Sequence, residues 1–285
     1  MNPVEVLSVG IATVDNIVLV DRYPDRDERV IAVQHARSIG GPATVAAITM
    51  ARLGVKVALS AVVGNDEGGD FVVEILEREG VDTTLVERSE TPTTQSTIVI
   101  SRSEQSRAIM VKPERVASKK PLGDLPPWIH VDHFGATVIK EWGVKRGDGS
   151  RLSLDVGYPF EGLSSSDWDL YVPSEKITID TSTASKDENW VVISHGERGS
   201  AYSDGNLSGV APAISVDVVS TLGAGDVFHG AMVATQVWGM PIDEATAFAN
   251  VVAGISCKGL DGYSAVPSRE EALKFLGAMK VGSNS

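Results

Sequence analysis

The chain has 285 residues, enough for one large α/β domain or two modest ones. Its formal net charge is −13, and no Lys/Arg-rich cluster reverses that charge locally, which argues against nucleic acid as a partner. The sequence has a single cysteine, Cys257, no apolar run of membrane-spanning length and no basic, apolar leader. We therefore expect a cytoplasmic protein that binds neither nucleic acid nor membrane.

The first third of the chain combines one buried strand with two segments of a different kind. An apolar run from Val4 to Gly10 predicts the buried strand. Residues 11–37 mix apolar pairs with a charged stretch and then alternate, which is typical of exposed strands around a loop. Residues 95–111 hold two β-rich runs joined by polar residues, which predicts a hairpin. We expect these two segments to form a small lid of β-strands.

Elsewhere the chain alternates between predicted strands and helices. A helix is expected from Pro42 to Gly54, because proline is tolerated in a first helical turn and glycine is a good cap. Later helices are expected near 225–239, near 243–258 and from Ser268, with short apolar strands at 128–132, 152–155, 168–172 and 190–194. This alternation predicts a mainly parallel sheet flanked by helices. We expect residues 1–285 to form one three-layer α/β domain that carries the lid.

The strongest chemical signal is a run of small residues at a helix start. Gly223, Ala224 and Gly225 lack bulky side chains, so their N–H groups can point together at one anion, supported by the helix dipole. Asp226 follows in the first turn. An isolated Gly-Asp pair would be an ordinary helix cap, but a carboxylate beside a phosphate site can take the proton of an attacking hydroxyl. The P-loop and dinucleotide-binding fingerprints do not occur in the sequence.

Two segments resemble the signatures of the ribokinase-like (PfkB) carbohydrate kinases. The stretch 223–226 resembles the second signature, and 40–43 with the Ala-rich helix ending at Gly54 resembles the first. Their order and separation fit the family, and the resemblance spans nearly the whole chain. The stretches 9–15 and 20–24 and residue Asp27 look most like ketohexokinases. The Gly-Gly-Pro-Ala form of the first signature and residues 217–219 resemble sulfofructose kinases.

The resemblance implies a ribokinase-like fold and transfer of the γ-phosphate of ATP to a hydroxyl group of a small sugar, with Mg²⁺ accompanying the ATP. Asp226 would be the general base, and Gly223 to Gly225 the anion hole. The sugar would be bound by Asp15 and by Asp27 of the lid, with Gly40 and Gly41 allowing close backbone approach. Arg29 is a basic counterpart for an anionic substituent on the sugar.

The nucleotide side of the resemblance rests on a second loop. Residues 194–199 resemble the family's Thr-x-Gly-x-x-Gly loop, which assigns ATP contacts to Ser194, Gly196 and Gly199. Thr221, at the entrance to the anion hole, and Asn250, in the following helix, are the other expected ATP contacts. The stretch 259–264 resembles the loop that closes over the base.

Some positions depart from the family pattern. Ser220 stands where many relatives carry Asp, which leaves activation by a monovalent cation open. Pro42 and Val45 replace the asparagines with which ketohexokinases contact fructose. The segment around Glu175 is a degraded form of the Asn-x-x-Glu motif linked to Mg²⁺, so the sequence assigns no metal ligands.

Two other functions stay open, and an assembly is expected. A nucleoside kinase of the same fold would need an aromatic or apolar sandwich for its base, which residues 11–37 offer only at Tyr23. A catalytically idle sugar or nucleotide sensor would fit the degraded Mg²⁺ motif.

Exposed lid strands need covering, so we expect a homodimer formed through the lid. His229, next to Phe228 on the predicted helix, is interpreted as a packing or surface residue.

Overall fold

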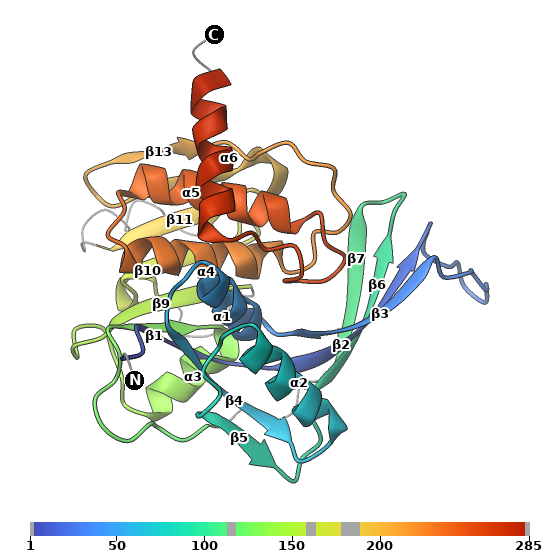
Figure 1. The fold of residues 1–285 in the computed structure, drawn as a ribbon, viewed down its shortest axis with the longest axis horizontal. Helices are drawn as coiled ribbons and strands as arrows, with labels where there is room; N and C mark the ends of the chain where they lie inside the picture. The colour runs from blue at the N-terminus through green and yellow to red at the C-terminus, as the bar shows by residue number, and fades with distance from the viewer. Residues whose placement is uncertain (1–2, 113–117, 158–163, 178–188, 283–285) are drawn as a thin grey trace.

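The computed structural model describes residues 3–112, 118–157, 164–177 and 189–282, and its strands form two sheets (Figure 1). The larger sheet has nine strands in the order β13-β12-β11-β10-β9-β8-β1-β4-β5. All neighbouring pairs from β11 to β5 are parallel, and only the pairs β11–β12 and β12–β13 are antiparallel. The predicted mainly parallel α/β fold is therefore confirmed.

Five strands of this sheet, β1, β8, β9, β10 and β11, lie close to their predicted places. The bounds of all nine strands are β1 Val6–Val9, β4 Val57–Gly64, β5 Val86–Ser89, β8 Trp128–Val131, β9 Arg151–Val156, β10 Leu170–Pro173, β11 Trp190–Ser194, β12 Ser200–Ser203 and β13 Ser208–Ala211. Three of them, β1, β8 and β10, are buried along their whole length. Strands buried on both faces read as continuous apolar runs, which is how the sequence displayed them.

Helices cover both faces of the sheet. Their bounds are α1 Pro42–Arg52, α2 Glu67–Arg78, α3 His133–Glu141, α4 Ala224–Val237, α5 Ile242–Ser256 and α6 Arg269–Gly282. Alternate residues of β1 show the two faces: Val6 packs in the core formed with α1, α4 and α5, whereas Leu7 packs in the core formed with α3. No helix in the described ranges is long and apolar enough to cross a membrane.

The second sheet is the lid, which projects from one edge of the molecule (Figure 1). Its strands are β2 Thr13–Val20, β3 Gln34–Gly40, β6 Gln95–Ser101 and β7 Ser106–Val111, in the order β3-β2-β6-β7. β2 and β6 are parallel neighbours, and their inward side chains pack against Leu222 of the anion turn. The residues of this small cluster are Ile17, Leu19, Ile98, Ile100 and Leu222. The lid thus touches the site it was predicted to cover.

Candidate active site

The predicted anion turn is present at the start of α4. Gly223 is the N-cap in a left-handed conformation (φ 73°), and no side chain caps the helix at this end. The first N–H groups of a helix have no partner within it, so those of Gly225 and Asp226 remain available to an anion. Ser220 helps to shape the turn, because its Oγ accepts a hydrogen bond of 3.0 Å from the Leu222 N–H.

The turn leaves open space where a phosphate would lie. A methyl group added at Gly225 would meet no heavy atom within 4 Å. Gly223 is different, since a Cβ there would lie 2.5 Å from the Cα of Gly262, and its positive φ also disfavours other residues. Gly223 therefore allows the loop 259–264 to pack closely, and Gly225 leaves open space at the start of α4.

Asp226 is partly buried beside this cradle, and its pKa is raised well above the ordinary value. Burial is the main cause, followed by the nearby negative charge of Asp155, which also shares a hydrogen bond with Asp226. The charge of Asp132 adds to the effect, while Arg107 opposes it. A carboxyl group whose pKa is moved toward neutrality is better able to accept a proton from a hydroxyl than an ordinary surface aspartate.

Asp132 links the catalytic turn to the first glycine segment. It is fully buried after β8, and its carboxylate accepts hydrogen bonds from the N–H groups of Ile11 (2.9 Å), Ala43 (3.3 Å) and Gly135 (2.8 Å). Gly41 packs closely against Ile11, because a Cβ at Gly41 would lie 2.2 Å from the Ile11 carbonyl oxygen. Asp132 therefore holds the N-terminus of α1 within electrostatic reach of Asp226.

Asp15 lies near the start of β2, where the lid leaves the central domain. It is 7% exposed, and its Oδ1 accepts hydrogen bonds from Thr13 (2.7 Å) and Ser96. Burial raises its pKa, although both hydrogen bonds favour the ionised form. A Cβ at Gly40 would lie 2.0 Å from Asp15 Oδ2, so glycine is needed for the carboxylate to sit there. The structure thus brings together Asp15, Gly40 and Gly41 as expected from the sequence.

Asp27 and Arg29 lie elsewhere. Both belong to the loop between β2 and β3, and the side chains of both are exposed. Asp27 has a left-handed backbone (φ 60°), and its carboxylate lies 3.9 Å from Arg26. Asp15 is near one end of β2 and this loop follows the other end (Figure 1), so the structure does not bring these two residues to Asp15.

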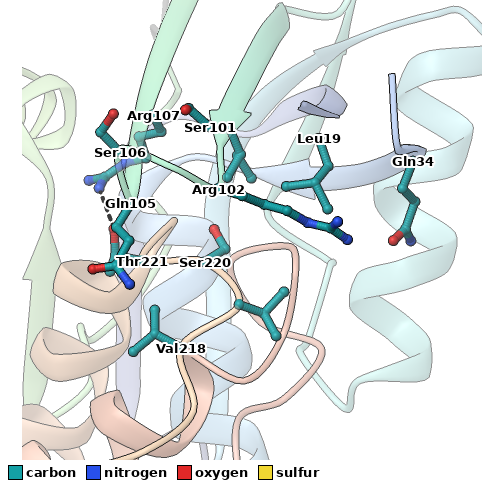
Figure 2. Close-up of a pocket in the computed structure, with 12 residues that line it drawn as sticks. Leu19, Gln34, Ser101, Arg102, Gln105, Ser106, Arg107, Val218, Ser220 and Thr221 are labelled. Carbon is teal, nitrogen blue, oxygen red and sulfur yellow. Dashed lines mark hydrogen bonds between the residues drawn. The ribbon is translucent and has the colours of Figure 1, made fainter. Parts of the chain in front are cut away.

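A pocket of about 280 Å³ lies between the lid and the segment that leads into the turn (Figure 2). Arg107 of β7 reaches across it and donates a hydrogen bond of 3.1 Å to Thr221 Oγ1. The rest of the lining is mixed: polar side chains come from Gln34, Ser101, Arg102, Gln105, Ser106 and Ser220, and apolar ones from Leu19, Ile100, Val218 and Val219. Such a lining suits a hydroxylated or anionic ligand next to the anion turn.

The loop expected to contact ATP follows β11. Ser194 ends this strand, Gly196 (φ 59°) starts a single 3₁₀ turn, and Gly199 (φ 89°) ends it. Asn250 is 8% exposed in α5 and donates hydrogen bonds to the carbonyls of Ala211 (3.0 Å) and Pro212 (3.3 Å). Its amide therefore joins α5 to the end of β13, and this geometry favours a supporting role over direct contact with a base.

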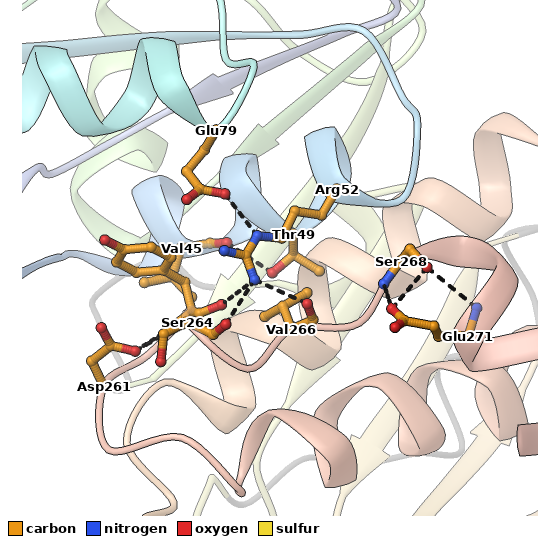
Figure 3. A network of polar contacts seen from close by, with 10 residues as sticks. Val45, Thr49, Arg52, Glu79, Asp261, Ser264, Val266, Ser268 and Glu271 are labelled. Carbon is orange, nitrogen blue, oxygen red and sulfur yellow. Dashed lines mark hydrogen bonds and ion pairs between the residues drawn. The ribbon is translucent and has the colours of Figure 1, made fainter.

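A half-buried arginine fixes the loop that follows α5 (Figure 3). Arg52 donates hydrogen bonds to the carbonyls of Tyr263 (2.9 Å), Ser264 (3.0 Å) and Val266 (3.0 Å), and pairs with Glu79 at 2.7 Å. Asp261 at the other end of this loop accepts a hydrogen bond of 2.7 Å from Ser38 of the lid strand β3. The loop thereby connects the lid with the wall beside the anion turn.

The residues described here do not define a metal site. No group of three or more His, Cys, Asp or Glu within the described ranges could hold a metal ion. Glu175 is instead engaged by Arg198 and by His195, whose Nδ1 lies 3.1 Å away, and the hydrogen bond from His195 is the main reason that the Glu175 pKa is lowered. We assign no protein ligand to Mg²⁺ and derive no step through it.

Sequence reasoning missed four residues of this site: Arg107, Asp132, Asp155 and His229. Asp132 and Asp155 come at the carboxyl ends of the parallel strands β8 and β9, and such ends meet at the ligand-binding edge of an α/β sheet. That signal was present in the sequence. For His229 and Arg107 no local pattern was available, because only the fold brings them to Asp226. His229 is buried and contacts Asp155, so it is not a surface residue.

Comparison with known proteins places this site in a family. A ribokinase from Haemophilus influenzae is 24% identical over 94% of this chain and 97% of its own length, and the ketohexokinase of Mus musculus is 26% identical over 93% and 100%. The fold matches ribokinase from Thermotoga maritima (TM-score 0.78, 24% identity, 96% and 100% covered) and a nucleoside kinase from Methanocaldococcus jannaschii (TM-score 0.80, 15%, 96% and 98%).

The family match itself covers both signatures. Residues 4–136 and 174–269 match the pfkB family of carbohydrate kinases, and these ranges contain Asp15, Gly40, Gly41 and the whole anion turn. The relatives are phosphotransferases that act on hydroxyl groups, as the sequence predicted. This chain belongs to the pfkB family of carbohydrate kinases.

Proposed function

We propose that this protein transfers the γ-phosphate of ATP to a hydroxyl group of a small sugar bound under the lid, with Asp226 as the general base. The observation that carries the proposal is the pairing of an uncapped, unobstructed helix start with a carboxyl group of raised pKa in the same turn. One group binds phosphate and the other removes a proton, and both are needed for a hydroxyl to attack phosphorus.

The transfer follows from these positions. The sugar hydroxyl gives its proton to the Asp226 carboxylate while its oxygen forms a bond to the γ-phosphorus. The bond from that phosphorus to the oxygen bridging it to the β-phosphate breaks, and ADP leaves with the electron pair. The N–H groups at the start of α4 and the guanidinium of Arg107 stabilise the negative charge on the transferred group. Mg²⁺ would arrive with the ATP phosphates and supply further charge neutralisation.

We propose that Asp15 marks the part of the site that binds the sugar. A buried carboxylate that already accepts hydrogen bonds from Thr13 and Ser96 is held rigidly, and its second oxygen can accept hydrogen bonds from sugar hydroxyls. We propose Gly40 and Gly41 as the backbone that the sugar approaches. Ser194, Gly196, Gly199 and Thr221 are proposed to line the path of ATP. Asp27 and Arg29 would contact only a substrate that reaches the lid loop, since both are exposed there.

A substrate panel tests this function together with the base. Release of ADP would be measured with ribose, fructose, sulfofructose, 2-keto-3-deoxygluconate and adenosine. We expect turnover with one of the sugars, and a kcat about 1,000-fold lower in Asp226→Asn with little change in ATP affinity, since only the proton acceptor is lost. Turnover of adenosine alone would identify a nucleoside kinase. Calorimetric binding of sugar and ATP without ADP formation would identify an idle sensor, and near-normal turnover in Asp226→Asn would refute the mechanism.

We also propose that residues 1–285 act as one domain and pair through the lid as a cytoplasmic homodimer. The edge strand β7 exposes Ile109, Met110 and Val111, which are 49%, 54% and 47% exposed, and the lid loop between β2 and β3 exposes Ile31 at 89%. An exposed edge strand with apolar side chains needs covering. Light scattering should give twice the chain mass for the wild type and the single-chain mass for Met110→Asp. A monomeric wild type would contradict the dimer.

A further inference from the structure

Two histidines and a carboxylate lie beneath Asp226, and the reaction proposed above does not use them. Asp155 near the end of β9 and His229 on α4 are each 5% exposed, and His130 on β8 is fully buried. Burying a charged group without a partner is costly, so these side chains need one another or a function. Their position next to a catalytic base makes the second explanation worth pursuing.

The contacts connect His229 of α4 to Asp155, and Asp155 to Asp226. Nδ1 of His229 lies 2.5 Å from Oδ2 of Asp155, and neither atom has another polar partner among the described residues. Asp155 in turn shares a hydrogen bond with Asp226. His229 follows Asp226 by three positions, so both side chains project from the same face of α4. One helix and one strand thereby hold three titratable groups in a row.

We propose that Asp155 and His229 form a positioning pair that holds the carboxyl group of Asp226 in place and controls when it carries a proton. His229 supplies the positive charge that allows Asp155 to stay ionised in a buried place. Ionised Asp155 then accepts the hydrogen bond of the Asp226 carboxyl group and fixes its orientation. Neither Asp155 nor His229 has to touch the sugar or ATP for this role.

The electrostatic effects agree with that division of roles. Burial alone would raise the pKa of Asp155, but the charge of His229 and the hydrogen bond with it, with smaller contributions from His130 and Asp226, outweigh burial, and the pKa is lowered. The pKa of Asp226 is raised by burial and by Asp155. The proton of the carboxyl pair therefore resides on Asp226, and raising the pH removes it to give the active base.

The other charged and titratable groups around the pair come from three elements. Arg107 of the lid favours ionised Asp226, and Asp132, after β8, opposes it. His130 contacts Ser153 Oγ at 3.2 Å through Nδ1, and its ring centroid lies 6.5 Å from that of His229. Burial lowers the pKa of His130 to about 4, so it is neutral at physiological pH.

The two members of the pair act on Asp226 in opposite directions, which gives a sharp test. Asp155→Asn removes the negative charge that keeps the proton on Asp226, so the base ionises at lower pH. His229→Gln removes the charge that keeps Asp155 ionised, so the carboxyl pair retains its proton to higher pH. We expect the acid limb of the kcat/KM–pH profile to move down by about one pH unit in Asp155→Asn and up by a similar amount in His229→Gln.

A change elsewhere in α4 serves as the matched control. Thr235 is buried in the same helix, nine residues beyond Asp226, and its hydroxyl donates to the Met232 carbonyl (2.7 Å). Thr235→Val should leave the acid limb unchanged. If Asp155→Asn does not fold, His229→Gln and His229→Asn carry the test, because both must show the upward shift. Acid limbs that stay in place, or that move in the same direction, would show that the two residues only pack the helix and would overturn the proposal.

The proposal rests on the function proposed above, and a measurement without turnover separates the two. In protein labelled with ¹³C at the aspartate carboxyl carbons, the signal of Asp226 is identified by its loss in Asp226→Asn. Its titration midpoint should be lower in Asp155→Asn and higher in His229→Gln than in the wild type. A wild type without kinase activity that shows these shifts would refute the function and keep the pair. An active wild type whose Asp226 titration midpoint does not shift in the two variants would keep the function and refute the pair.

Discussion

The two glycine segments of the active site require glycine for opposite reasons. At Gly40, under the lid, a side chain would collide with the carboxylate of Asp15, which the protein itself places there. At Gly225, in the anion turn, a side chain would meet nothing at all. The first glycine satisfies the packing of the folded chain, whereas the second leaves open space at an uncapped helix start. Open space alone does not mark a binding site, since Gly277 has it too; at Gly225 it matters because free N–H groups of the helix start adjoin it.

Gly225→Ala should show the largest effect on activity. Because the added methyl group occupies the cradle, we expect kcat/KM to fall roughly 100-fold, similar to the loss of one anion-hole donor. The free energy of unfolding should rise by about 0.5 kcal/mol, since alanine is the better helix residue and finds free space here. Steady-state kinetics and urea unfolding measure the two quantities.

Gly277→Ala is the matched control for that variant. Gly277 also lies in a helix, α6, and a Cβ there meets nothing within 4 Å. It should gain similar stability with unchanged activity. If Gly225→Ala kept full activity, the cradle would not be a phosphate site, and the contrast between the two segments would fail.

Gly40→Ala should show a smaller loss of activity but a loss of stability. The Cβ would displace the Asp15 carboxylate from Thr13 and Ser96, at a cost of about 2 kcal/mol for an overpacked buried site. We expect the KM for the sugar to rise while the KM for ATP stays close to the wild-type value. Urea unfolding and separate KM measurements test this. An unchanged unfolding free energy would mean that Asp15 can move aside freely and that Gly40 is not needed for packing.

Much of the fold was predictable because its signals are local. The apolar runs of β1, β8 and β10 predicted buried strands. A proline at the start of the helix at Pro42, and a capping box at Ser268, predicted where two helices begin. The lid segments were separable by their alternation of apolar and polar residues. Details of the lid were less visible: residues 21–33 form a loop rather than extending β3, since charged and turn-forming residues dominate there.

The active site was predictable only in part. Asp226 and the anion turn depend on a few consecutive residues, which a sequence displays directly. Asn250 was expected at the nucleotide, but its amide is hydrogen-bonded to the end of β13. Ser220 stands where many relatives carry Asp, and its hydroxyl accepts a hydrogen bond from the Leu222 N–H. In both cases, hydrogen-bond partners distant in space or hidden within the turn decided the role, and residue type alone does not reveal them.

The sequence by itself determined the strand and helix order, the anion turn and the family, because each depends on near neighbours along the chain. Only the tertiary structure decided which charges surround Asp226. Asp132, Asp155, Arg107 and His229 come from four separate elements, and the parallel sheet brings the ends of its strands to one edge. Electrostatic interactions depend on distance through space and on burial. For that reason the sequence could predict Asp226 as the base, but it could not predict the charges that set the pKa of Asp226.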